Sequence, residues 1–223
     1  MPAFFGRREG GRVFITGADA NHLAKSLRAK PGEEIEVIDP EGFLLSVRLV
    51  SVSQASVEGS VVAERPHWPE PIARVTIAIA NLPAPSLDLV LSRCTEAGAY
   101  AFVVFSAARS VGRAAKLERW SSICREAAML AGRSRIPEVS LASSFGAALE
   151  SEENPVVLTR EAPRRLSQLT ELDHLTLFIG PEGGWSEREL ELAEVTATLG
   201  PRNLRADTAA LVGLAIALSA RGA

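Results

Sequence analysis

The spacing of apolar residues changes near residue 70 and divides the chain into two parts. In the first part, short runs rich in Val and Ile alternate with polar residues, which is the period-2 pattern of half-buried strands. This pattern predicts strands at residues 13–16, 34–39, 44–52 and 56–63. One helix is predicted around residues 20–28. Together these elements make a small β-barrel-like module of about 65 residues.

Residues 65–71 contain three prolines, Pro66, Pro69 and Pro71. Because proline ends helices and central strands, we expect a stiff linker here. Beyond it, apolar runs predict strands at residues 74–80, 100–105, 155–159, 175–179 and 203–204. Helices are predicted at residues 85–97, 114–132, 187–198 and 207–220. This alternation is typical of an α/β domain with a largely parallel sheet, and we expect domains at residues 1–66 and 67–223.

The composition of the 223-residue chain, with 47% hydrophobic and 23% charged residues, is that of a globular protein. We expect it to be cytoplasmic, because no run nears the roughly 20 apolar residues of a membrane span and the N-terminus lacks a signal-peptide pattern. Cys94 and Cys124 lie in predicted helices without CxxC spacing, which predicts buried, reduced thiols. The three histidines have no ligand spacing, and no metal site is expected.

The net charge of −3 does not by itself suggest a nucleic-acid partner. The basic residues are unevenly placed, however, since thirteen of the 24 lie within residues 1–30 and 109–135. Two interpretations stay open for these segments. They form positive surfaces that hold phosphates, or they are solvated helix faces.

The strongest local signal is a glycine-rich turn at residues 180–184 (GPEGG), between a predicted strand and a predicted helix. Ser186 and Glu189 have the spacing of a capping box, which defines the start of that helix. Glycine lets the backbone approach a ligand closely, and open α/β sheets bind ligands at the carboxyl ends of their strands. The turn is not a GxGxxG fingerprint, and the chain has no GxxxxGK[ST] loop, so neither a dinucleotide nor a nucleoside triphosphate is indicated. Taken alone, the turn is either a ligand loop or a tight connection.

A second segment, residues 199–209 (LGPRNLRADTA), repeats this arrangement of a Gly-Pro pair before a helix. Asp207 is predicted to cap that helix at its N-terminus. The helix is apolar on almost every side, so we expect it to be buried against the sheet or a second subunit.

At these two segments the sequence resembles the RsmE family, the 16S rRNA uridine-N3 methyltransferases of the knotted SPOUT superfamily. Residues 180–184 and 204–209 (LRADTA) match its C-terminal signature. Further matches occur in the family's order at residues 95–98, at Arg109 with Ser110, and at Trp120 with residues 125–127. The start of the chain, with Phe4, Phe5 and His22, looks like the family's PUA-like RNA-binding module.

The resemblance implies an α/β methyltransferase domain with a deep trefoil knot, a PUA-like β-barrel before it, and a homodimer. It implies that the chain binds S-adenosyl-L-methionine in the knot and methylates N3 of a uridine in the 16S rRNA of the small ribosomal subunit. The cofactor-binding residues that it implies lie in three loops and comprise Leu158, Thr159, Ile179, Gly180, Pro181, Glu182, Gly183, Gly184, Leu199, Gly200, Leu204, Arg205 and Thr208.

Methylation at N3 of uracil requires a base that removes the N3 proton and a group that stabilises the charge developing on the uracil oxygens. Glu182 and Asp207 are the candidates for the first role, and Arg109 and Arg205 for the second. The structural alternatives are that Asp207 only caps its helix and that Glu182 only pairs with a neighbouring arginine. RNA contacts are expected from seven residues, namely Arg7, Arg12, His22, Arg28, Arg113, Arg125 and Arg133.

The sequence departs from the family pattern mainly in the helix predicted at residues 114–132. Leu130 stands where a glutamine is usual and Ala131 where a serine or cysteine is usual, while Ala108 replaces an acidic residue. The cofactor signature is thus retained and the segment expected to face RNA is altered. Two alternatives therefore stay open: a methyltransferase of the same superfamily that acts on another RNA nucleotide, or a catalytically weak RNA-binding protein that aids ribosome assembly.

Overall fold

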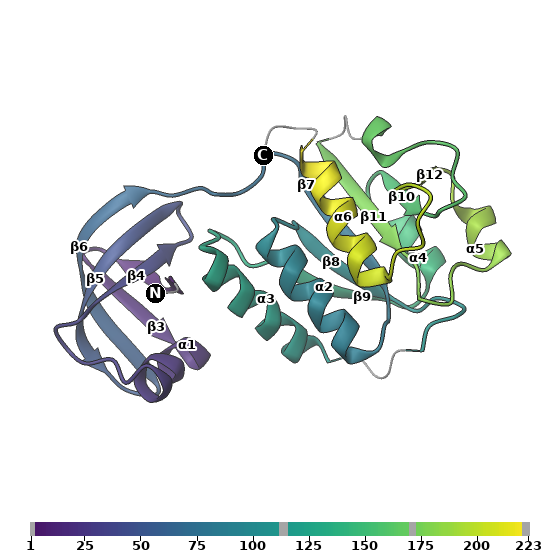
Figure 1. The fold of residues 1–223 in the computed structure, drawn as a ribbon. Coiled ribbons are helices and arrows are strands. Elements are labelled where there is room, and N and C mark those ends of the chain that lie inside the picture. The colour runs from purple at the N-terminus through teal and green to yellow at the C-terminus, as the bar shows by residue number, and fades with distance from the viewer. Residues whose placement is uncertain (1–2, 112–115, 170–172, 220–223) are drawn as a thin grey trace. The chain divides into compact units, whose positions relative to one another are not determined.

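The computed structural model describes residues 3–111, 116–169 and 173–219. The chain forms two units, each with its own core (Figure 1). The first unit consists of Met1–Glu70 with Ala128–Arg135, and the second of Pro71–Ala127 with Ile136–Ala223. The expected boundary at 66/67 therefore differs from the observed one, because residues 67–70 and 128–135 make their contacts within the first unit.

The first unit is a six-stranded sheet with the order β1-β4-β5-β6-β3-β2. Its strands are β1 (Phe4–Phe5), β2 (Arg7–Glu9), β3 (Arg12–Thr16), β4 (Glu34–Asp39), β5 (Phe43–Val52) and β6 (Ser56–Pro66). β1 pairs with β4 in parallel, and the other pairs are antiparallel. The four predicted strands are confirmed, and the two short edge strands β1 and β2 were not predicted.

Gly6 explains how this sheet curls into a barrel-like module. The edge strands β1 and β2 are separated only by Gly6, so the two edges of the sheet come together at this residue. A Cβ atom on Gly6 would lie 2.7 Å from Val37 and 2.8 Å from Val13, which leaves no room for any side chain. Phe4, Ile15, Leu23 and Leu45 are fully buried in the core of this unit.

The predicted helix at residues 20–28 differs from the observed one in its position and type. An α-helical turn, α1 (Gly17–Asn21), runs into a π-helical turn, η1 (His22–Ser26). The Leu27 amide donates to the His22 carbonyl across five residues at 3.1 Å. Arg28 has φ +53° in the left-handed region, which no helix interior accepts, so the helix ends before it.

The second unit is built on a parallel sheet of six strands with the order β12-β10-β11-β7-β8-β9, and the predicted parallel α/β arrangement is confirmed. The strands are β7 (Arg74–Ala80), β8 (Ala101–Phe105), β9 (Glu138–Ala142), β10 (Pro155–Leu158), β11 (His174–Ile179) and β12 (Thr196–Ala197). Alternate residues of β7 enter two different core clusters, because successive side chains of a strand point to opposite faces.

Helices cover both faces of this sheet. They are α2 (Ala84–Glu96), α3 (Leu117–Ala131), α4 (Phe145–Ser151), α5 (Glu187–Leu192) and α6 (Ala206–Ser219), with a 3₁₀ turn, η2 (Leu166–Gln168). Side chains of α2, α3 and α6 enter one core cluster, and those of α4 and α5 the other. The apolar helix α6 contacts α2, β7 and β11, which confirms its expected packing on the sheet (Figure 1). Cys94 and Cys124 are buried and free, as predicted.

Three predictions for the last third of the chain are wrong. The helix expected at residues 187–198 ends at Leu192, and the chain then extends into β12. The strand expected at residues 203–204 is absent, because this segment is irregular and leads directly into α6. Asp207 is not the N-cap of α6, since the helix begins one residue earlier at Ala206. The strand β9 and the short helix α4 were not predicted.

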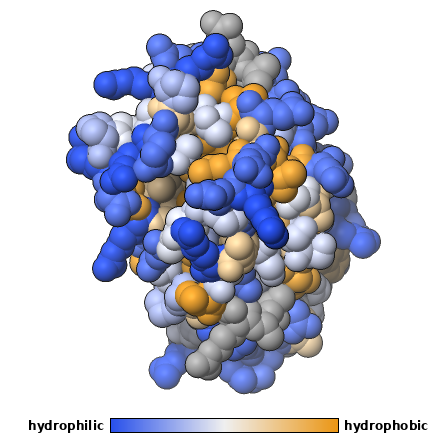
Figure 2. Space-filling model, turned by 90° about the vertical axis from the view of Figure 1, so that its right-hand side faces the viewer, coloured by the Kyte–Doolittle hydropathy of each residue, from blue (hydrophilic) through white to orange (hydrophobic). Residues whose placement is uncertain are grey.

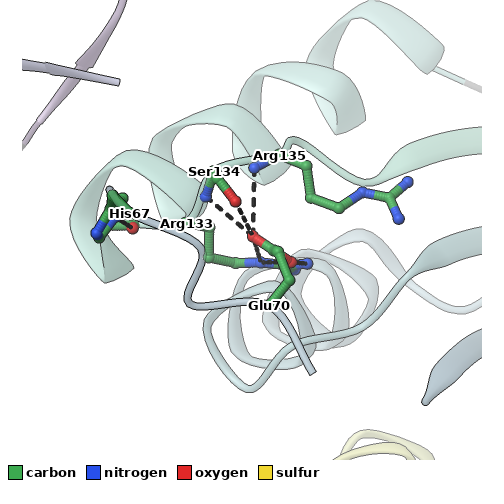
Figure 3. Close-up of polar contacts among 6 residues, drawn as sticks. His67, Glu70, Arg133, Ser134 and Arg135 are labelled. Atoms are coloured by element: carbon green, nitrogen blue, oxygen red, sulfur yellow. Dashed lines mark hydrogen bonds and ion pairs between the residues drawn. The ribbon is translucent and has the colours of Figure 1, made fainter. Parts of the chain in front are cut away.

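A buried carboxylate joins two separate segments of the first unit (Figure 3). Glu70 accepts hydrogen bonds from the Arg133 guanidinium, from the Ser134 amide at 2.9 Å and hydroxyl at 3.2 Å, and from the Arg135 amide at 3.3 Å. The side chains of Arg133 and Glu70 are only 4% and 6% exposed. Beside them, His67 Nε2 lies 2.6 Å from the Gly132 carbonyl oxygen. The expected RNA contact of Arg133 is therefore corrected, because its charge is buried against Glu70 and not presented at the surface.

We predict that Glu70→Gln lowers the free energy of unfolding by about 3 to 5 kcal/mol, because it leaves the buried Arg133 charge without its carboxylate. The matched control is Glu34→Gln, which removes the carboxylate of the exposed pair with Arg48 and should cost less than about 1 kcal/mol. Urea unfolding of the full chain measures both free energies. Equal losses in the two variants would contradict the prediction.

Candidate functional site

A cavity of about 420 Å³ lies at the carboxyl ends of β10 and β11. Three loops supply most of its walls, and they follow β10, β11 and β12 in the chain. Because neighbouring parallel strands end at the same edge of a sheet, these loops meet there. The residues that line the cavity are Leu158, Thr159, Arg160, Glu161, Ile179, Gly180, Pro181, Glu182, Gly184, Trp185, Leu190, Thr198, Leu199, Gly200, Arg202, Asn203, Leu204, Ala206 and Ala209.

The turn after β11 places backbone groups against the cavity. The Gly184 amide donates to the Pro181 carbonyl at 2.8 Å and closes the turn. Gly184 has φ +72° and Gly200, on the third loop, has φ +113°, conformations that favour glycine. The helix that follows begins with the predicted capping box, because Ser186 and Glu189 each bind the other's backbone amide.

Trp185 connects the ends of β10 and β11. Its indole Nε1 donates to the Leu158 carbonyl at 2.9 Å, and its ring packs directly on Gly180. A Cβ atom on Gly180 would lie 2.8 Å from that ring. Trp185 also stacks on Phe105 and contacts Phe145, with ring centroids 6.1 and 4.8 Å apart. This residue therefore forms a fixed wall of the cavity.

Residues 195–198 lie between two parts of the preceding loop. On one side, the amides of Val157 and Thr159 donate to the carbonyls of Val195 and Ala197, both at 2.9 Å. On the other side, the Thr198 amide donates to the Arg164 carbonyl at 2.9 Å, and the Leu166 amide donates to the Thr198 carbonyl at 3.1 Å. The residues on the two sides, 157–159 and 164–166, are the ends of one loop, so the later segment passes between the ends of the earlier one.

The structure brings together ten of the residues that were expected to bind a cofactor. These ten line the cavity and are Leu158, Thr159, Ile179, Gly180, Pro181, Glu182, Gly184, Leu199, Gly200 and Leu204. Gly183, Arg205 and Thr208 do not line it. Nine other lining residues were not among those expected, namely Arg160, Glu161, Trp185, Leu190, Thr198, Arg202, Asn203, Ala206 and Ala209. Ala206 and Ala209 belong to the LRADTA segment, Leu190 lies in α5, and the other six lie within or beside the three expected loops.

The four candidates for chemistry occupy different environments. Glu182 is exposed and lines the cavity. Arg109 is exposed, and its Nη1 donates to the Gly183 carbonyl at 2.9 Å. Asp207 is half-buried and accepts hydrogen bonds from the Thr208 amide at 2.7 Å and hydroxyl at 3.3 Å. Arg205 is exposed, and its carbonyl oxygen accepts the Ala209 amide at the start of α6.

The basic residues expected to contact RNA are also differently placed. Arg7 pairs with Glu9, and Arg12 pairs with Glu58 at 2.6 Å, while both arginines stay exposed. His22 and Arg28 are exposed, whereas Arg125 is half-buried. Arg113 lies outside the described residues. The charges of Arg7 and Arg12 are thus partly offset by neighbouring carboxylates.

Glu189 is a buried acid close to the cavity. Its carboxylate accepts the amides of Ala108 and Ser186, each at 2.8 Å, and the Ser186 hydroxyl at 2.8 Å. Burial alone would raise the pKa of Glu189, but these hydrogen bonds and the nearby charge of Arg109 lower it below its ordinary value. Glu189 is therefore ionised at neutral pH.

The surface on the side of α5 and β12 is mostly hydrophilic. Figure 2 shows this side of the molecule, where hydrophobic patches are separated by hydrophilic residues. Among the described residues, no group of three or more His, Cys, Asp and Glu side chains is arranged to hold a metal ion. In the same residues, no helix combines the length and apolar character that crossing a membrane requires.

We predict that Gly180→Ala destabilises the chain by about 1 to 3 kcal/mol, because the added methyl group overlaps the Trp185 ring. Gly146→Ala is the matched control, since it lies in α4 and its added Cβ atom would be 3.9 Å from its nearest neighbour. There the substitution should stabilise by about 0.5 to 1 kcal/mol through helix propensity. Urea unfolding measures both, and a neutral Gly180→Ala would contradict the packing described.

Comparison with known proteins agrees with this geometry. The protein-family model for an RNA methyltransferase domain matches residues 69–218, and the family model for an RNA methyltransferase PUA domain matches residues 15–60. Ribosomal RNA small subunit methyltransferase E of Bacillus subtilis is 33% identical over 222 residues, covering 90% of this chain and 87% of that protein. The protein of the same name from Mycobacterium bovis is 33% identical over 226 residues, covering 92% and 85%.

A solved structure extends the comparison to the fold. Ribosomal RNA small subunit methyltransferase E from Neisseria gonorrhoeae, bound to S-adenosyl methionine, superimposes with a TM-score of 0.86 and 27% identity. The superposition covers 96% of this chain and 95% of that one. The chain therefore belongs to the RNA methyltransferase family that contains ribosomal RNA small subunit methyltransferase E.

Proposed function

We propose that this protein uses S-adenosyl-L-methionine to methylate N3 of a specific uridine in the 16S rRNA of the small ribosomal subunit. The observation that carries this proposal is the cavity at the ends of β10 and β11, whose loops hold the GPEGG and LRADTA segments. Membership of the family supports the reaction class, and the related structure bound to S-adenosyl methionine supports the cofactor.

The cavity suits a ligand of this kind. Its volume of about 420 Å³ lies in the range of pockets for small organic ligands, and its wall combines apolar Leu158, Leu199 and Leu204 with glycine backbone. Its lining also contains Glu161, Glu182, Arg160 and Arg202, whose charges of both signs match a molecule with ammonium, sulfonium and carboxylate groups. The cofactor supplies an electrophilic methyl group on a sulfonium sulfur.

Glu182 is the stronger of the two candidates for the base. Methylation requires the N3 proton of uracil to pass to an acceptor, and the acceptor must reach the bound nucleotide. Glu182 lines the cavity, whereas the Asp207 carboxylate is bound to Thr208 and does not line it. Arg109 and Arg205 stay candidates for stabilising the negative charge on the uracil oxygens. Arg109 uses one guanidinium donor on Gly183 and carries four others.

The hydrogen bonds of residues 195–198 support a trefoil knot in the second unit. Those residues pass between the two ends of the loop 157–166, and the chain then continues into α6. A chain that enters such a loop and does not return through it is threaded. Knots of this kind are rare exceptions to the usual topology of proteins.

An apolar face on α2 and α6 supports the proposed homodimer. Leu89 of α2 is 46% exposed, and Leu211, Val212 and Ile216 of α6 are half-buried. The two helices contact each other, so their exposed apolar atoms belong to neighbouring surfaces. A second copy of the chain that covered this face would remove them from water.

RNA recognition is proposed for the first unit and for part of the second. Arg7, Arg12, His22 and Arg28 are exposed on the first unit, and the PUA-domain match supports an RNA-binding role there. Arg113 and Arg125 stay proposed contacts, whereas Arg133 does not. A uracil N3 is shielded in structured RNA, so the target nucleotide has to be flipped into the site. A cytoplasmic location is also proposed, and an rRNA substrate supports it.

We predict that the purified protein binds S-adenosyl-L-methionine in calorimetry and that rRNA from a deletion strain lacks one 3-methyluridine. Mass spectrometry of 16S rRNA fragments, with the restored gene as control, locates the lost modification. An unchanged 16S profile together with a lost modification elsewhere would identify another RNA nucleotide as the target. Absence of cofactor binding would instead favour an RNA-binding assembly protein.

We predict that Glu182→Gln slows methyl transfer at least tenfold at saturating cofactor, because the amide cannot accept the N3 proton. Asp207→Asn should leave the rate within about twofold, since that carboxylate binds Thr208 outside the cavity. Single-turnover transfer of radiolabelled methyl groups to 16S rRNA measures both rates. The assignment is overturned if the Asp207 variant loses activity and the Glu182 variant keeps it.

A further inference from the structure

Glu189 makes more contacts than the cap of a short helix requires. A capping box needs only the exchange between Ser186 and Glu189 at the start of α5. The same carboxylate also accepts the Ala108 amide at 2.8 Å, from a segment 81 residues earlier in the chain. Glu189 is 7% exposed, so this charge is held away from water by contacts on both sides. The additional contact ties α5 to the loop after β8.

Ala108 lies inside a closed turn. The Ala107 amide donates to the Ser110 hydroxyl oxygen at 3.0 Å, and the Ser110 amide donates to the Ala107 carbonyl at 3.0 Å. Glu189 binds the middle of this turn through the amide of Ala108. The backbone of the next residue, Arg109, therefore lies between two fixed positions, the Ala108 amide and Ser110.

Arg109 connects the turn at residues 107–110 to the glycine-rich turn at residues 180–184. Its Nη1 donates to the Gly183 carbonyl at 2.9 Å. A Cβ atom on Gly183 would lie 3.3 Å from the Arg109 Cβ, so the two backbones approach closely. Residues on either side of Gly183 line the cavity. The contacts thus run from Glu189 through Ala108 and Arg109 to the turn at residues 180–184.

We propose that Glu189 is a positioning residue for cofactor binding, which holds the turn at residues 107–110 so that Arg109 braces the glycine-rich turn against the cavity. This inference rests on the proposed function, because it assumes that the cofactor occupies the cavity. A carboxylate is required at this position. The three groups that face it, the Ala108 amide, the Ser186 amide and the Ser186 hydroxyl, are all donors.

The test compares Glu189→Gln in the natural chain and in an Arg109→Ala background. In the natural chain, Glu189→Gln should weaken binding of S-adenosyl-L-methionine about tenfold in calorimetry. This is the change expected because the substitution removes one hydrogen bond to a charged group. It should also speed hydrogen exchange of the Gly184 amide, measured by NMR without cofactor, because this amide closes the braced turn. In the Arg109→Ala background, the same substitution should change each quantity by less than about twofold.

Ser186→Ala is the control for a role in helix capping alone. It removes the hydroxyl from the capping box but leaves the bond between Glu189 and Ala108. This variant should lower the stability of the chain by about 1 kcal/mol. Its cofactor affinity and Gly184 exchange should match those of the natural chain. If Glu189→Gln does not fold, Arg109→Ala alone provides the test. It should speed hydrogen exchange of the Gly184 amide, and unchanged exchange would contradict the role of Arg109 in holding the glycine-rich turn.

The outcomes separate this inference from the proposed function. The positioning role is overturned if Glu189→Gln changes cofactor affinity and Gly184 exchange equally with and without Arg109. It is also overturned if Glu189→Gln in the natural chain leaves the exchange of the Gly184 amide unchanged. A natural chain that does not bind S-adenosyl-L-methionine overturns the proposed function and the positioning role with it. In that case the exchange data still decide whether Arg109 holds the glycine-rich turn.

Discussion

Hydrogen bonds on both sides of residues 195–198 determine how the end of the second unit is arranged. This segment pairs with residues 157–159 along one edge and with residues 164–166 along the other. The two ends of the loop at residues 157–166 therefore cannot separate from residues 195–198 without breaking these backbone hydrogen bonds. Two walls of the cavity, at residues 158–161 and 198–200, come from these bonded segments. Their geometry is fixed by backbone pairing, with little need for particular side chains.

The same constraint explains where prediction from the sequence failed. Residues 187–198 have a composition that favours a helix, yet α5 ends at Leu192 because the following residues gain more by pairing with β10. Residues 203–204 are apolar or neutral and follow a Gly-Pro pair, but they line the cavity and join no sheet. Both errors concern long-range pairing, which local periodicity does not record. The central strands β7 and β11 were predicted closely because they are long and buried on both faces.

The candidate site was likewise predicted only where local motifs marked it. Glycines marked the turn at residues 180–184, and ten expected residues line the cavity. Trp185 was not assigned to the site, because its contact with Gly180 and its bond to Leu158 depend on the folded arrangement of β10 and β11. Arg133 was expected to contact RNA because it belongs to the basic segment at residues 109–135. Its side chain is instead buried against the carboxylate of Glu70, which lies on a distant segment of the chain.

The division of the first unit into two chain segments has a consequence for the order of folding during synthesis. Residues 1–70 leave the ribosome first, but their unit also contains residues 128–135, which are made after β7, α2 and β8. Glu70 lacks its partner Arg133 until then, and Met129 has not yet joined the core of the first unit. The first unit therefore completes its structure only after a large part of the second has been synthesised. Although it is N-terminal, it does not follow the usual rule that N-terminal domains finish folding first.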